Sequence, residues 1–243
     1  MTRIAEVLLA DDPACWLAID VVADRYGVAR VGTVALRFGV IVPTVDGDAP
    51  PPASAAPSPP QSSSSSPTSR SLSLTGIVGW VLLDAPDPSQ RAIDGLTITH
   101  TTDGPELIEG DSAFLRIDHV VVTTPDLGRT VSALEAGFGE PCKRVRTLPT
   151  GSGAPLHQAF FRLGEVIVEV VGPPDADSER ADEPARFGGL VLVARDLDDL
   201  CTRLGPDVVN APRAAVQEGR RIATMRAAAG LGCPVALMDE RRR

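Results

Sequence analysis

The sequence predicts an α+β fold made of repeated units, each with one strand, one helix and three further strands. Three observations support this. The same order of strand-like and helix-like patterns recurs along the chain. The apolar runs have strand length and are rich in Val, Ile and Leu. Two predicted helices begin at Asp–Pro or Pro–Asp pairs, which favour helix starts. Such units usually bury their apolar faces against each other.

The first region, residues 1–110, is predicted to be a degenerate copy of this βαβββ unit. It gives a strand at 4–9, a helix from Pro13 to about Arg25, and strands near 28–30, 32–42 and 74–83, followed by the strand-like run LTITHTT. A Pro- and Ser-rich tract at 46–73 interrupts it. This tract has too few apolar residues to offset the entropy of ordering it, so we expect a disordered loop within the unit; a domain linker is the alternative.

The second region, residues 113–239, is predicted to hold two such units, at 117–171 and 187–238. Strands are expected near 117–123, 143–147, 156–163 and 166–171, with a helix from Pro125 to about Ala136. The order then returns, with a strand at 190–194, a helix at 197–204 and strands near 208, 221–226 and 234–238. A short polar loop joins the two units, which makes them the natural pair.

Composition narrows the functional classes. The formal net charge is −9, which disfavours binding to a nucleic-acid phosphate backbone, and basic residues cluster only at 241–243. The N-terminal sequence reaches Asp11 and Asp12 before any apolar run is long enough for a signal or membrane segment, so we expect a cytoplasmic protein without membrane contact. The four cysteines lie far apart without a CxxC pair, which is typical of reduced thiols.

Two polar side chains stand out because they lie in strands that are otherwise apolar. Alternation places His119 on one face with Ile117 and Val121, and Glu169 sits within the run VIVEVV. A carboxylate in such a strand costs several kcal/mol unless it is paired, protonated or bound to metal. A contact between His119 and Glu169 is the simplest solution, either as a structural pair or as part of a site.

Three further residues are candidates for ligand binding. Gln158 and Phe160 share one face of the predicted strand at 156–163, and ligand clefts combine apolar walls with a few polar groups. Periodicity does not decide which face of that strand lines the cleft. Arg226, in the predicted hairpin near the C-terminus, could bind an anionic substrate or could lie on a solvated strand face.

The runs IDHVVVTTPDLGRTVSALEAGFG, AFFRLGEVIVEVVGP and GLVLVARDLDDL, in this order, resemble the vicinal oxygen chelate superfamily of glyoxalases, bleomycin-resistance proteins and extradiol dioxygenases. The resemblance covers residues 117–238 and implies glyoxalase-like, cupped mixed sheets around a cleft in which a divalent metal commonly binds. It matches His119 and Glu169 to metal ligands of the first unit. The matching positions of the last unit, Gly189 and Ala236, have no side chain that could bind metal.

Two functions follow for the cleft, both with a small-molecule ligand. One is a glyoxalase-like lyase or isomerase, in which Glu169 acts as the catalytic base or as a ligand of a divalent metal held with His119. The other is a metal-free protein that sequesters its ligand, as bleomycin-resistance proteins do. Three units leave one without a partner, and an uncovered sheet face would favour a homodimer.

Overall fold

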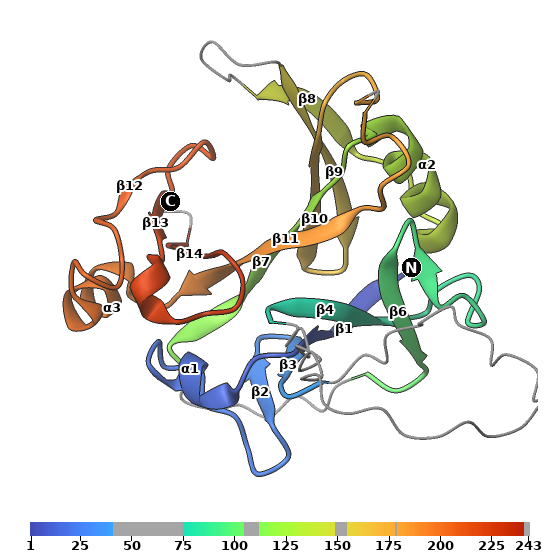
Figure 1. Ribbon diagram of the computed structural model, residues 1–243. Helices are drawn as coiled ribbons and strands as arrows, with labels where there is room; N and C mark the ends of the chain where they lie inside the picture. The colour runs from blue at the N-terminus through green and yellow to red at the C-terminus, as the bar shows by residue number, and fades with distance from the viewer. Residues whose placement is uncertain (41–74, 105–111, 149–154, 178, 241–243) are drawn as a thin grey trace, which may run out of the picture.

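The chain folds into two mixed β-sheets that pack against each other (Figure 1). The computed structural model describes residues 1–40, 75–104, 112–148, 155–177 and 179–240. The predicted disordered tract at 46–73 lies outside these residues. Six strands form the first sheet, in the order β2-β3-β1-β4-β6-β5, and eight form the second, in the order β12-β13-β14-β11-β7-β10-β9-β8. The α+β class with cupped, mixed sheets is confirmed.

The eight-stranded sheet contains two βαβββ units related by an approximate repeat. Its central strands β7 and β11 are antiparallel, and each pairs in parallel with the last strand of its own unit, β10 or β14. The first unit is β7 (Phe114–Thr123), α2 (Leu127–Phe138), β8 (Arg144–Leu148), β9 (Leu156–Leu163) and β10 (Val166–Gly172). The second is β11 (Arg186–Ala194), α3 (Leu197–Leu204), β12 (Arg213–Ala214), β13 (Arg221–Thr224), the 3-10 helix η1 (Ala227–Ala229) and β14 (Val235–Met238).

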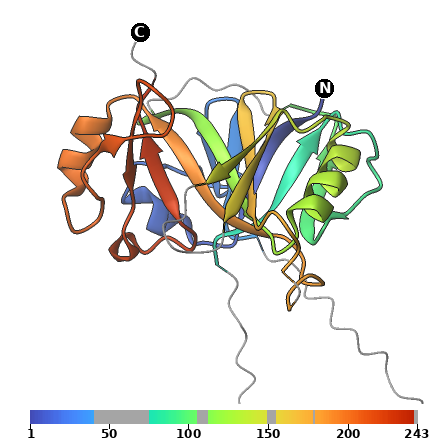
Figure 2. The same cartoon turned by 90° about the horizontal axis from the view of Figure 1, so that it is seen from above.

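Local sequence explains where the two helices of this sheet begin. Asp126 and Asp196 are N-caps in extended conformation, and their carboxylates accept hydrogen bonds from the backbone N–H groups of Arg129 and Asp199. Gly139 ends α2 in the left-handed conformation, at φ 64°. The two helices lie at opposite ends of the molecule in both views (Figures 1 and 2).

The six-stranded sheet is formed by the region 1–110, for which the sequence predicts one βαβββ unit. Its strands do not pair as a single such unit would. Its elements are β1 (Arg3–Leu9), α1 (Pro13–Leu17), β2 (Val28–Val31), β3 (Val34–Arg37), β4 (Ile77–Leu83), β5 (Ala92–Ile93) and β6 (Leu96–Thr101). Strand β4 does not close the first unit. It runs antiparallel to β1 and parallel to β6, as β11 does with β7 and β14. The region thus contains two shortened units, and strand order along the chain could not reveal this because pairing is set across the sheet.

Helix α1 is shorter than predicted and ends at Leu17. The next residues form tight turns, with N–H of Ile19 bonded to the Trp16 carbonyl and Asp20 at a positive φ of 62°. The Trp16 ring N–H donates to the buried carboxylate of Asp11 at 2.8 Å, which fixes the short helix against the sheet. Asp11 also accepts hydrogen bonds from the backbone N–H groups of Gly76 and Gly232, so the start of the helix is held by distant segments, while the tight turns after Leu17 end it.

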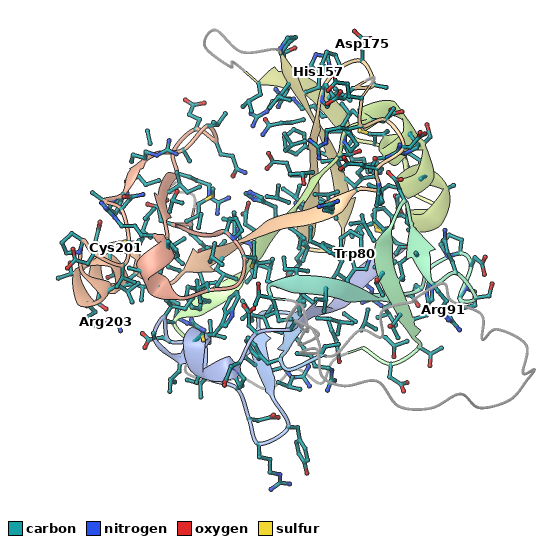
Figure 3. All side chains as sticks on the ribbon, in the orientation of Figure 1. Trp80, Arg91, His157, Asp175, Cys201 and Arg203 are labelled. Carbon is teal, nitrogen blue, oxygen red and sulfur yellow. The ribbon has the colours of Figure 1, made fainter. Side chains whose placement is uncertain are left out.

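One apolar core fills the space between the two sheets. Trp80 of β4 is fully buried there and makes edge contacts with Phe187 of β11 and Phe138 of α2, at ring-centroid distances of 5.0 and 5.7 Å (Figure 3). The face of the eight-stranded sheet that forms this core is therefore closed by the first sheet. The opposite face remains available for a ligand cleft.

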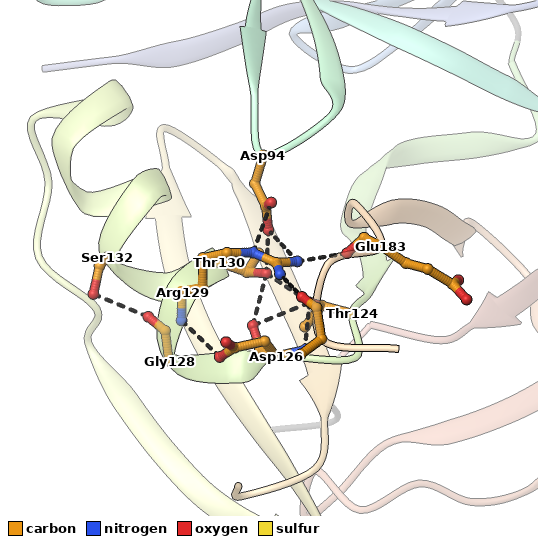
Figure 4. A network of polar contacts seen from close by, with 9 residues as sticks. Asp94, Thr124, Asp126, Gly128, Arg129, Thr130, Ser132 and Glu183 are labelled. Carbon is orange, nitrogen blue, oxygen red and sulfur yellow. Dashed lines mark hydrogen bonds and ion pairs between the residues drawn. The ribbon is translucent and has the colours of Figure 1, made fainter. Parts of the chain in front are cut away.

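A polar network joins α2 to the turn between β5 and β6 (Figure 4). Arg129 donates through Nε to Asp94 at 3.0 Å and through a terminal nitrogen to the Glu183 carbonyl at 2.6 Å, and the Thr130 hydroxyl also donates to Asp94. Together with the shared core, these contacts cover the N-terminal sheet within one chain. The argument for a homodimer from an uncovered unit loses its basis, while the oligomeric state stays a prediction. Among the described residues, no helix is long and apolar enough to cross a membrane.

Candidate functional site

A cleft of about 490 Å³ lies on the outer face of the eight-stranded sheet, between its two units. One side is formed by β8, β9 and β10, and the other by β12, β13 and β14. Apolar side chains make up much of its wall, namely Val121, Phe160, Ile167, Val216, Ile222 and Met238. Polar groups from β7, β9 and β10 converge on one side, so the cleft has the mixed lining that small-molecule sites share.

His119 reaches this cleft because β7 carries a bulge at Asp118. The pairing with β11 jumps from His119–Val191 to Ile117–Leu192, so Asp118 is an extra residue in the strand. Ile117 consequently joins Val120 in the core, while His119 lines the cleft. The predicted common face of Ile117 and His119 is therefore wrong. Simple alternation fails here because one extra residue in a strand moves the side chains before it to the opposite face of the sheet.

The bulge also turns Asp118 toward the ring of its neighbour. Asp118 Oδ2 lies 2.9 Å from His119 Nδ1, and its other oxygen accepts a hydrogen bond from Arg220 at 2.6 Å. Both side chains of the Asp118–Arg220 pair are at least nine-tenths buried. Burial alone would raise the pKa of Asp118, but hydrogen bonds from His119 and Arg220 outweigh it and hold that pKa well below its usual range.

On its far side the imidazole contacts Glu169. His119 Nε2 lies 3.3 Å from Glu169 Oε2, and the Gln158 amide donates to the other oxygen of Glu169. Arg146 Nε in turn donates to the Gln158 carbonyl oxygen at 2.7 Å. The contact between His119 and Glu169 that the sequence predicts is therefore present. A doubly protonated imidazole can donate to both flanking carboxylates, whereas the neutral ring can donate to only one.

The residues present do not match a chelating metal site. His119 and Glu169 are two donors, whereas catalytic zinc sites use three protein ligands and an open position. Val191, Ala236 and Met238 form an apolar cluster on the facing strands. Among the described residues, no three His, Cys, Asp or Glu side chains are grouped so that they could hold a metal ion.

The structure brings four of the five predicted site residues together. His119, Glu169, Gln158 and Phe160 all line the cleft, which settles the facing of strand β9. Arg226 does not line it. Strand β13 ends at Thr224, and Arg226 is an exposed residue at the start of η1 whose N–H bonds the Val208 carbonyl. The strand predicted near 221–226 thus ends before Arg226.

Several site residues were missed by the sequence reasoning. Asp118 and Arg220 are one example, and only the order Asp–His in IDHVVV hints at the first of them. Arg146 is another: it pairs across strands with Gln158, and Arg144 pairs with Phe160. Strand β8 therefore presents both arginines on the cleft face. Because Gln158 and Phe160 face the cleft, their cross-strand partners on β8 face it too. The register that makes Arg146 and Arg144 these partners cannot be read from the sequence.

Comparison with known proteins gives structural matches only. No protein-family model matches the sequence, and no curated protein sequence matches it. A variant of 4-hydroxymandelate synthase from Streptomyces coelicolor matches 99% of this chain and 93% of its own, with a TM-score of 0.61 and 14% identity. Methylmalonyl-CoA epimerase from Mycobacterium tuberculosis matches 56% of this chain and 94% of its own, with a TM-score of 0.43 and 17% identity.

The topology, together with the match to 4-hydroxymandelate synthase, defines the class of the protein as an α+β chain of paired βαβββ units with a cleft in the second sheet. The likeness to 4-hydroxymandelate synthase supports the fold that the resemblance to the vicinal oxygen chelate superfamily predicts. At 14% identity the likeness extends to the fold, so the activity has to be argued from the cleft itself.

Proposed function

We propose that the chain is a small-molecule-binding protein that holds an organic ligand in the cleft without a resident metal. One observation carries the proposal: the polar groups that β7, β9 and β10 direct into the cleft are already bonded to one another, and apolar side chains line its other side. Glu169 contacts both His119 and Gln158, and Val216, Ile222 and Met238 line the side formed by residues 213–238. A ligand with an apolar body would bury its surface against this wall.

Displacement of the His119–Glu169 contact would be needed before a metal could take both donors. The facing residues would then contribute no further ligand, so the site would bind metal weakly. This supports the metal-free reading over a chelate-dependent lyase.

A second candidate is an isomerase or lyase that works by proton transfer. The Glu169 carboxylate lines the cleft with its side chain 13% exposed, and His119 is oriented by Asp118 on its other ring nitrogen. A carboxylate held by a positioned imidazole can accept a proton from a carbon acid bound within reach. Glu169 would be the base, His119 would stabilise its charge, and Asp118 would fix the ring.

A thermal-shift screen in the presence of EDTA tests metal-free binding. At a ligand concentration about 100 times Kd, binding adds roughly 2.7 kcal/mol of stability, which raises Tm by about 5–10 °C for a chain of this size. The Ala236→Phe variant adds a ring beside Ile222 and Met238, which line the cleft, and should lose the shift because the larger side chain pushes into the ligand's space. The Val22→Phe variant, at a position 68% exposed and outside the cleft, should keep it. The proposal fails if every stabilising compound requires added metal.

Proton exchange separates the two candidates once a stabilising compound is known. In D2O, proton-transfer chemistry predicts that wild-type protein exchanges one carbon-bound proton of the ligand and that Glu169→Gln does not, although it still binds. Proton NMR of the ligand measures this. Binding without exchange in the wild type would leave sequestration as the function.

A further inference from the structure

We propose that the ligand of this cleft is an organic anion: an apolar body that enters the cleft and a carboxylate or phosphate head that binds the basic side chains at its rim. This inference rests on the proposed function, since it names the class of ligand that the same cleft would take. It starts from the distribution of charge over the molecule.

The cleft has the opposite charge to the chain as a whole. The chain carries a net charge of −9, with 32 acidic and 23 basic residues. Among the charged side chains that line the cleft there is a single carboxylate, Glu169, against a set of five cations. These are Lys143, Arg144, Arg146, Arg162 and Arg213. A concave site lined by charges of one sign concentrates their field, because its low-dielectric walls screen poorly.

Four of these cations lack a carboxylate partner among the described residues, and three of the four also lack a polar side-chain partner there. Lys143 pairs with Glu140 at 3.2 Å, and Arg146 donates to the neutral Gln158. Arg144, Arg162 and Arg213 form no ion pair within the part of the chain that the structure describes, and no acidic residue occurs at 149–154 in the nearby β8–β9 connection. Their charge is therefore available to a ligand.

Many arginines away from the cleft are paired: Arg180, Arg203 and Arg221 each contact a carboxylate at 2.9 Å or less. Others, such as Arg91 and Arg195, form no ion pair within the described residues, but they do not line the cleft. The cleft is distinguished because three unpaired arginines line a single cavity. Guanidinium groups suit the planar oxygens of carboxylates and phosphates.

The arrangement separates a charged rim from an apolar interior. Arg144 and Arg146 lie on β8 at one edge of the sheet, and Arg213 lies on β12 at the other edge (Figure 1). Between them, Ile222 and Met238 line the cleft. Arg146 also lies over the Phe160 ring, 5.1 Å from its centre, so this cation and the apolar wall adjoin. An anion with an apolar body fits this arrangement, because its body would contact the apolar interior while its head contacts the basic rim.

Two fluorescent probes of nearly the same shape test the inference. 8-Anilinonaphthalene-1-sulfonate carries an anionic head, and N-phenyl-1-naphthylamine is the same aromatic body without it. Fluorescence titration at about 50 mM salt should give the sulfonate a Kd at least about tenfold lower. Raising the salt to about 500 mM should shrink that advantage, because exposed charges are screened. Loss of both signals in Ala236→Phe shows that the probes occupy the cleft.

Variants of the rim connect the effect to the named cations. The double variant Arg144→Gln and Arg162→Gln should weaken sulfonate binding about tenfold or more and leave the neutral probe unchanged. Arg180→Gln, which removes a distant surface charge, should change neither. Both arginines of the double variant are exposed, so their replacement should leave the melting temperature nearly unchanged. Competition by benzoate or by phenyl phosphate then identifies the preferred head group.

The outcomes distinguish this inference from the proposed function. Equal Kd values for the two probes would overturn the anion inference and leave small-molecule binding intact. An unchanged sulfonate Kd in the double variant would also overturn it. If neither probe gives a signal that Ala236→Phe removes, the proposed binding function fails with it.

Discussion

The buried Asp118–Arg220 pair gives the sharpest prediction about stability. In the Asp118→Asn variant, Arg220 keeps the Asp239 carbonyl and the Gln217 amide as partners but loses its only carboxylate contact within the described residues. Removing one partner of a buried ion pair costs about 3–5 kcal/mol. Because Asn keeps an acceptor oxygen of similar shape, we expect the lower end, about 3 kcal/mol.

Urea unfolding at pH 7 measures this loss as a lower midpoint with an unchanged m value. The control is Asp84→Asn, which removes the exposed pair with Arg3, whose side chains are 51% and 55% accessible. An exposed pair of this kind contributes at most about 1 kcal/mol. Equal losses in the two variants, or a loss below about 1 kcal/mol for Asp118→Asn, would refute the role assigned to the pair.

The pH dependence of unfolding tests independently whether this stabilisation comes from the negative charge of Asp118. Because folding lowers the pKa of Asp118, the stabilisation is fully present above the ordinary aspartate pKa of about 4. It is lost as the pH falls below that value toward the lower folded-state pKa. The difference between wild type and Asp118→Asn should therefore shrink as the pH falls below about 4. A difference that stays constant from pH 6 to below about 3 would contradict the charge-based explanation.

Two further predictions concern packing and thiol chemistry. A Cβ at Gly137 of α2 would overlap Ile93 Cδ1, so Gly137→Ala should cost about 1–3 kcal/mol in urea unfolding. Gly128→Ala, in the same helix but with no atom closer than 3.6 Å, should be neutral or slightly stabilising; equal costs for both would remove the packing argument. Burial, with a contribution from Asp11, raises the pKa of Cys233 to about 12. Iodoacetamide at about pH 8 should therefore label Cys233 in urea but hardly in the native protein, as mass spectrometry would show, and equal rates would contradict its burial.

The sequence carried most of the information about the second sheet. Strand-length apolar runs and the N-cap Asp126 are local signals, and they located every strand and helix of residues 117–172 to within a few residues. The unusual polarity of His119 and Glu169 in apolar strands also pointed to the cleft. These signals work because burial demands the same residue types wherever a strand is covered on both faces.

The first sheet was harder to predict because its strands are interrupted and short. Whether β4 ends one unit or begins another depends on its antiparallel partner β1, and nothing in the sequence of β4 names that partner. Similarly, α1 is only five residues long, and its start is held by Asp11, which binds the Trp16 ring and the backbone N–H groups of the distant residues Gly76 and Gly232. Both outcomes are set by contacts between segments, which local propensity does not encode.

The sequence by itself determined the class of fold, the two units of residues 113–239 and the pair His119–Glu169, because hydrophobic period and buried polarity are local properties. The tertiary structure decided what the cleft contains. The bulge at Asp118 turned His119 away from Ile117, the register of β8 on β9 brought arginines beside Gln158, and the end of β13 left Arg226 outside. Facing and register depend on pairing between strands, where a shift of one residue exchanges core for cleft.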